Sequence, residues 1–164
     1  MSSRDRDPTG RARNARPRDA LGRPLPHGAQ GIDEHPEDVQ LSPEEAVHKA
    51  QQLIDDGYPF YAHEVLEGVW KASEGVHREL WQGLAQLAVG LTHVQRGNSK
   101  GAATLLHRGA ARIAPYANDP PHGVDIPGLV GHARSLAARI ERDGLDAVSL
   151  VDLRPRLLIR GRPA

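Results

Sequence analysis

The chain has 164 residues, of which 38% are apolar, and its 21 basic and 21 acidic side chains cancel to no net charge. It contains no cysteine, which excludes disulfides, thiolate zinc sites, iron–sulfur clusters and thiol nucleophiles. No apolar run approaches the roughly 18 residues of a membrane-spanning helix, and the first residues lack the apolar stretch of a secretory signal. We therefore expect a cytoplasmic protein without a membrane role.

Charge is segregated along the chain. Residues 1–24 carry seven arginines and three aspartates, whereas residues 33–56 carry eight acidic side chains and one lysine. Residues 1–40 are rich in arginine, proline and glycine and poor in apolar side chains, so we expect a flexible, largely irregular arm. The arm has no aromatic residue on which a base could stack, and a solvated arm is therefore favoured over a nucleic-acid-binding one.

Five helices are predicted after the arm. Residues 42–56 begin with a Ser42–Glu45 capping box and with Pro43 at the first helical position, followed by an apolar stripe. A second helix opens at Pro59 and ends near residues 73–75. The remaining helices are predicted over residues 77–96, 99–116 and 127–143, and Gly97–Asn98 is predicted to be a left-handed helix stop.

The predicted fold class is all-α: one bundle over residues 41–144, built from two helix–turn–helix hairpins and one further helix. The turn and helix-start residues of the second helix recur 40 residues later, which favours two hairpins of one design. Residues 145–164 are predicted to be a C-terminal extension, a short helix or an extended segment, with Leu157–Ile159 against the bundle.

Polar residues interrupt the apolar pattern of the second and third helices. On the second helix His63, Glu67 and Trp70 share one face, and Glu64 lies one position round. On the third helix Glu79, Gln82, Gln86 and His93 follow one stripe. Because a short loop joins these helices, they must pack together, and we expect both sets of side chains to meet at one seam.

Three interpretations of this seam remain open. The polar groups form a hydrogen-bonded network in or beside the core, where each must be paired. Alternatively, the stripe is the solvated side of an amphipathic helix. Finally, the cluster binds a small molecule or a divalent metal ion. His63, Glu67 and His93 would coordinate the ion, because metal sites in helix bundles are built from side chains on facing helices.

Catalytic signatures are weaker. The sequence contains no phosphate-binding Gly-Lys-Ser/Thr loop and no Gly-x-Ser-x-Gly elbow. His63 and Glu67 have the chemistry of acid–base groups, but no nucleophile or oxyanion donor can be named beside them. The catalytic residues are therefore unknown. Whether the protein is an enzyme stays open, and a protein without catalytic activity is favoured.

Residues 60–70 (FYAHEVLEGVW) and 79–109 resemble the core of a bacterial and archaeal family known as domain of unknown function 309. The shared pattern is an aromatic-x-x-His-Glu-x-x-Glu-x-x-Trp helix, a Gln-Gly-x-x-Gln helix that ends in His, and an Arg-Gly-Asn turn. The resemblance implies a small all-helical bundle and no particular activity. Its motif residues fall on His63, Glu64, Glu67, Trp70, Gln82, Gln86, His93, Arg96, Gly97 and Asn98.

The leading functional hypothesis is a binding or scaffold module with its polar site at the seam. The alternative is a metal-dependent, hydrolase-like enzyme that uses His63, Glu67 and His93, with a divalent ion as cofactor. A third hypothesis is a nucleic-acid-associated protein that uses the arginine-rich arm. The expected partner is a second copy of the chain or another protein, with nucleic acid disfavoured.

Overall fold

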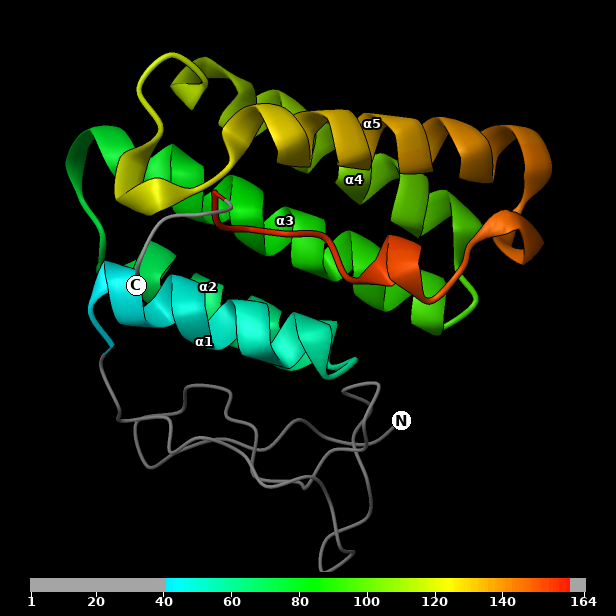
Figure 1. Ribbon diagram of the computed structural model, residues 1–164, viewed down its shortest axis with the longest axis horizontal. Coiled ribbons are helices and arrows are strands. Elements are labelled where there is room, and N and C mark those ends of the chain that lie inside the picture. The colour runs from blue at the N-terminus through cyan, green and yellow to red at the C-terminus, as the bar shows by residue number, and fades with distance from the viewer. Residues whose placement is uncertain (1–40, 160–164) are drawn as a thin grey trace, which may run out of the picture.

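The computed structural model describes residues 41–159, and these form five α-helices (Figure 1). The helices are α1 (Pro43–Asp55), α2 (Pro59–Ala72), α3 (Arg78–Gln95), α4 (Ser99–Ile113) and α5 (Ile126–Asp143). The predicted all-α bundle is confirmed. The predicted arm 1–40 and the last residues, 160–164, lie outside the described residues.

Local sequence signals explain where the helices begin and end. Ser42 caps α1 through its side chain and forms the predicted capping box with Glu45. α4 ends at Ile113, earlier than predicted, and continues only as a single 3₁₀ turn through Tyr116. Pro115 explains the difference, because proline lacks an N–H for the helical ladder and its ring clashes with the carbonyl four residues earlier in an α-helix.

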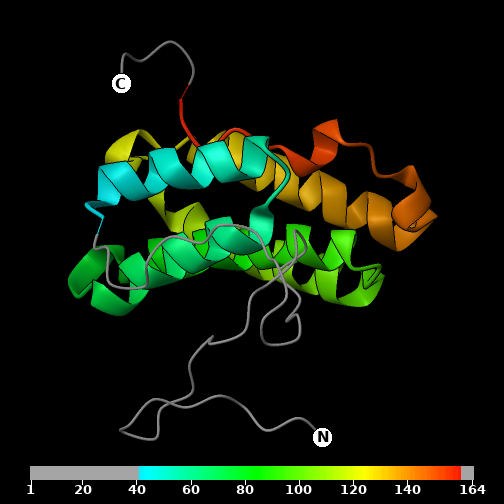
Figure 2. The same ribbon diagram turned by 90° about the horizontal axis from the view of Figure 1, so that it is seen from below.

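The helices form two layers around one core. α3 packs between α2 and α4, while α1 packs on α2 and α5 packs on α4. In the view turned by 90°, α1 and α5 lie on one side of the molecule and α2 and α3 on the other (Figure 2). The fully buried side chains at the centre include Leu66, Leu84, Leu106 and Leu136. Burying such leucines stabilises the bundle by about 1.5–3 kcal/mol each.

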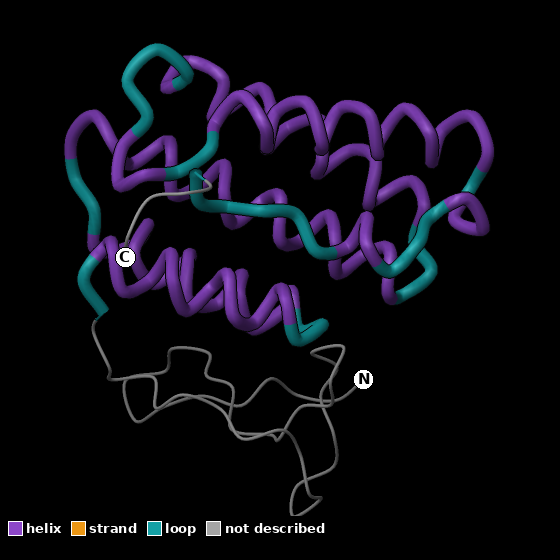
Figure 3. Tube along the Cα trace, in the orientation of Figure 1, coloured by secondary structure: helices purple, strands orange, loops and turns teal. Residues whose placement is uncertain are grey.

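The chain after α5 returns along the gap between α5 and α1 as a loop (Figure 3). Two 3₁₀ turns, Leu145–Ala147 and Val151–Leu153, precede an extended segment over residues 154–159. Leu158 forms an isolated antiparallel bridge with Val124, and Leu157 is buried in the core. Of the two conformations predicted for this extension, the extended one describes residues 154–159, and the 3₁₀ turns precede it.

None of the helices within residues 41–159 is long and apolar enough to cross a membrane.

Candidate functional site

The predicted site residues of α2 lie along the flank of that helix that faces α3. Pro59 starts the helix, and Ala62, Leu66 and Val69 bury the adjoining stripe in the core. His63 and Trp70 are seven residues apart, so they lie on the same side of α2 about 10 Å apart along its axis. Both side chains are half-buried. We call this flank, with the facing ends of α3, the α2–α3 seam.

An arginine stacks on an aromatic ring at each end of the α2–α3 seam. The guanidinium carbon of Arg78, the first residue of α3, lies 4.8 Å from the centre of the Trp70 ring. At the other end, the guanidinium carbon of Arg96 lies 5.3 Å from the centre of the Phe60 ring. Such cation–π contacts contribute about 0.5–1 kcal/mol at exposed positions. They align α2 with α3 and place a positive charge at both ends of the seam.

A hydrogen-bonded pair, His63 and Glu67, lies between these two ends. Nε2 of His63 is 2.7 Å from Oε2 of Glu67, and Nζ of Lys71 is 2.7 Å from Oε1 of the same carboxylate. The hydrogen bond from His63 is the largest cause that lowers the pKa of Glu67, to about 2. Partial burial opposes this shift, and the hydrogen bond and charge of Lys71 assist it. Glu67 is therefore ionised at neutral pH.

Two buried nitrogen atoms of the α2–α3 seam have no hydrogen-bond partner. They are Nδ1 of His63 and Nε1 of Trp70. A third orphan, Oε1 of Gln95, belongs to a side chain whose amide nitrogen donates to the carbonyl of Gly57, 2.9 Å away. Buried polar groups are paired in the large majority of cases, so two orphans on one helix flank call for an explanation.

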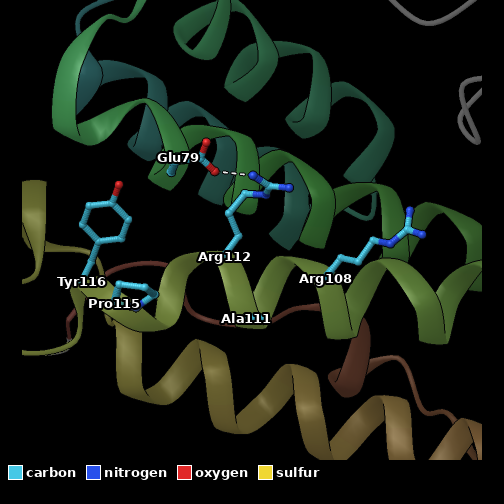
Figure 4. A pocket seen from close by; sticks show the side chains of 6 residues that line it. All are labelled: Glu79, Arg108, Ala111, Arg112, Pro115 and Tyr116. Atoms are coloured by element: carbon cyan, nitrogen blue, oxygen red, sulfur yellow. Dashed lines mark hydrogen bonds and ion pairs between the residues drawn. The ribbon is translucent and has the colours of Figure 1, made fainter.

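The polar residues of α3 do not all face α2, as the prediction of a single seam required. Glu79 and Gln86 contact α4, and His93 contacts Asn98. Nε of Arg112 on α4 donates to Oε1 of Gln86 at 3.0 Å, and the same guanidinium forms an ion pair with Glu79 (Figure 4). Gln82 is half-buried on the same stripe. Glu79 and Gln86 thus contact α4 and do not join the His63–Glu67 pair.

His93 lies in the last turn of α3, next to the turn that leads to α4. Its Nδ1 lies 3.2 Å from the side-chain nitrogen of Asn98, whose Oδ1 accepts from the N–H of Gly101 and so caps α4. Partial burial, and secondarily the charge of Arg96, lower the pKa of His93. The left-handed stop is confirmed at Gly97, whose φ is +79°, whereas Asn98, at φ −101°, is the N-cap residue of α4.

The structure does not assemble the predicted three-ligand metal site. Within residues 41–159, no group of three or more His, Asp or Glu side chains is placed to hold a metal ion. His63 and Glu67 contact each other, and His93 contacts Asn98. Glu64, the remaining motif residue of α2, is half-buried. Of the predicted residues, the α2–α3 seam therefore brings together His63, Glu67 and Trp70.

Sequence reasoning missed Arg112 and Arg78. The tip of Arg112 lies beside an open surface groove of about 600 Å³ that is also lined by Arg108, Pro115 and Tyr116 (Figure 4). No pattern on α4 distinguishes Arg112 from its exposed neighbour Arg108. Arg78 was open to prediction, because the short loop after α2 places the first residues of α3 beside Trp70.

Residues 47–105 match the model of a family described as Domain of unknown function (DUF309). This range covers α2, α3 and the α2–α3 seam, most of α1 and the first half of α4. No curated protein and no solved structure matches the chain.

Proposed function

We propose that this chain, which belongs through residues 47–105 to the domain of unknown function 309 family, is a binding module whose ligand occupies the α2–α3 seam. One observation supports this most directly: the buried Nδ1 of His63 and Nε1 of Trp70 have no partner in the folded chain. An unpaired buried polar group costs about 1–3 kcal/mol. A ligand that pairs with both atoms would recover this free energy on binding.

The two atoms specify the chemistry of the ligand. The indole N–H only donates, so Trp70 requires an acceptor such as a carboxylate or carbonyl oxygen. Glu67 accepts from Nε2 of His63, which leaves Nδ1 of the neutral imidazole as an acceptor that requires a donor. The ligand therefore has an acceptor at one end and a donor at the other, separated on the scale of two helical turns.

The charges of the α2–α3 seam also favour a ligand with an acceptor at the Trp70 end and a donor at the His63 end. Arg78 stacks on Trp70, so the end of the ligand that accepts from the indole is also close to a cation. Glu67, with its pKa lowered to about 2, supplies a negative charge beside His63, where the donor end would lie. A small zwitterion, or a polar segment of a protein partner with the same two ends, fits this arrangement.

The experiment is a titration of the full chain labelled with ¹⁵N, observed at the indole N–H signal of Trp70. The probe is 6-aminohexanoate, and hexanoate and hexylamine are controls that each lack one end. We expect the zwitterion to move the Trp70 signal and raise the melting temperature, and each control to do so less. His63→Ala should abolish both responses, and Trp70→Phe, which lacks the indole signal, should abolish the rise in melting temperature. His107→Ala should not, although His107 forms a similar 2.7 Å pair with Glu141.

Two results would contradict the proposal. One is an indole proton of Trp70 whose chemical shift in the free protein is that of a hydrogen-bonded N–H, because that protein would already contain its partner. The other is an absence of any response to the zwitterion in the wild-type chain. Zn²⁺ is added as a separate probe: a shift near neutral pH that His63→Ala removes would establish the divalent-ion alternative instead.

A further inference from the structure

The C-terminal segment, residues 154–159, is extended and lies between α1 and the loop before α5 (Figure 1). We call its binding site, formed by Gln51 of α1 and by Gly123 and Asp125 of that loop, the groove. From α1, the side-chain amide of Gln51 donates to the carbonyl of Pro155 at 3.1 Å and accepts from the N–H of Leu157 at 2.6 Å. From the loop before α5, the N–H of Asp125 donates to the carbonyl of Leu157 at 2.8 Å. The N–H of Ile159 donates to Gly123 at 2.9 Å. Backbone groups of the segment are thus bound from both sides.

The side chains of the segment alternate as they do in bound extended peptides. Pro155 and Leu157 are buried, and Leu157 is only 3% exposed. Arg154 and Arg156 between and before them are exposed. In strand-like peptide recognition, main-chain hydrogen bonds give affinity and pockets for alternate side chains give specificity. The groove therefore recognises proline and leucine two residues apart in an extended chain.

The walls of the groove are held by contacts that do not involve the segment. Gln51 is also bonded to Asp55, one turn along α1, at 3.0 Å. On the opposite wall, Nδ1 of His122 lies 2.8 Å from Glu44 of α1, and its ring lies 5.4 Å from that of buried Trp81. His122 adopts the left-handed conformation, with φ +55°, which non-glycine residues adopt only where surrounding contacts enforce it. Gln51, and His122 next to Gly123, thus make contacts that do not depend on the segment.

Residues 149–152 connect the segment to the bundle. Contacts of Asp152 hold this connection in place, although two of its side chains are exposed. Asp152 forms an ion pair with Arg139 of α5 at 2.8 Å and accepts from the N–H of Ser149 at 2.9 Å. Leu150 and Val151 beside it are 72% and 79% exposed. Exchange of residues 154–159 alone would leave this ion pair and the connection in place.

We propose that the groove is a peptide-recognition surface that the chain's own residues 154–159 fill, and that the same segment of a second copy can replace them. The proposal does not depend on the α2–α3 seam. Exchange of the segment between two copies would join them without any new type of contact.

Two full-length variants test the exchange by complementation. Leu157→Asp puts a charge into the leucine pocket and so leaves a vacant groove, whereas Gln51→Ala weakens the groove and leaves the segment unchanged. Mixed together, the two variants should form a 1:1 complex in analytical ultracentrifugation, and each alone should stay monomeric. Excess peptide of sequence RPRLLI should dissolve the complex. Arg156→Ala in the Gln51→Ala chain is the control and should leave association unchanged.

A fluorescent RPRLLI peptide gives the second measurement. It should bind Leu157→Asp at least about 100-fold more tightly than the wild-type chain if the groove of the wild type is open in roughly 1% of molecules. A folded Leu157→Asp chain that binds neither the peptide nor the Gln51→Ala chain would overturn the proposal. So would the loss of its cooperative melt, because the segment would then be an inseparable part of the core.

Hydrogen exchange in the wild-type chain tests the opening of the segment without any substitution that could alter the fold. The amide protons of Leu157 and Ile159 should exchange at least about 100-fold faster than those of Leu84 and Leu91 in α3, because the segment opens separately. Equal rates would show that the segment leaves the groove only on global unfolding, and would overturn the proposal.

Discussion

His63 and Glu67 are joined one turn apart on α2, with 2.7 Å between Nε2 of the imidazole and Oε2 of the carboxylate. The pair holds the imidazole with Nε2 toward the carboxylate, and the buried Nδ1 has no partner. A carboxylate that accepts from one ring nitrogen also determines the role of the other. In the proposed binding module, Glu67 would therefore act on a ligand through the orientation of His63.

This pair predicts a loss of stability in acid. The pKa of Glu67 is lowered from 4.5 to about 2, so its contribution to folding is fully present above about pH 4.5 and is lost as the pH falls toward 2. The carboxylate side chain is 32% exposed, and solvent screening reduces its contribution to about 1 kcal/mol. Glu67→Gln should remove this part of the acid dependence in urea unfolding curves. Glu141→Gln, in the exposed His107–Glu141 pair, should leave it unchanged.

Trp70→Phe tests whether the indole N–H is unpaired in the free protein. The substitution keeps an aromatic ring beneath Arg78 and removes the buried donor. Loss of packing destabilises the chain, and removal of an unpaired donor opposes this by about 1–3 kcal/mol. We expect a net change within about 1 kcal/mol by chemical denaturation. A loss of 3 kcal/mol or more, on the order of a Trp→Ala substitution, would show that the N–H has a partner.

Gly109 permits the close contact between α3 and α4. A Cβ at this position would lie 2.7 Å from Cδ2 of Leu87 and 2.9 Å from the carbonyl oxygen of Gly83. Gly109→Ala should therefore destabilise the bundle by about 1–3 kcal/mol, although alanine is the better helix former. At Gly131, on the exposed side of α5, a Cβ would meet nothing within 4 Å. Gly131→Ala should raise stability by about 0.5–1 kcal/mol, and thermal melts of both variants compare the two effects.

Gln51 is one of two buried polar side chains among residues 41–159, and its amide binds the backbone of Pro155 and Leu157. Gln51→Ala removes both hydrogen bonds and leaves backbone groups unpaired, which should cost about 1–3 kcal/mol. Gln52→Ala, at the exposed neighbouring position, should change stability by no more than about 0.5 kcal/mol. Equal effects of the two substitutions would show that the C-terminal segment does not depend on Gln51.

The elements of the fold were predictable because their signals are local. Ser42, Pro43 and Glu45 define the start of α1 within four residues, and Gly97 stops α3 without reference to any distant residue. On α2, the His63–Glu67 contact follows from i, i+4 spacing alone. Helix ends deviated where two local preferences competed, as at Pro115, where proline ended α4 before the apolar pattern did.

The partners of the polar side chains depended on distant residues. Spacing placed Glu79 and Gln86 on one stripe of α3, but a stripe lies between two neighbouring helices and periodicity does not say which one it contacts. Arg112, 26 residues after Gln86, decided this by binding both side chains from α4.

The amino-acid sequence by itself determined five helices, their caps and the sharing of one helix flank by His63, Glu67 and Trp70, because these properties depend on residues within a turn or two of one another. Only the tertiary structure decided that the nitrogen atoms of His63 and Trp70 lack partners and that Gln51 binds residues 155 and 157. Both facts depend on which side chains the packed helices bring within hydrogen-bonding distance, or fail to bring, and local pattern does not encode those distances.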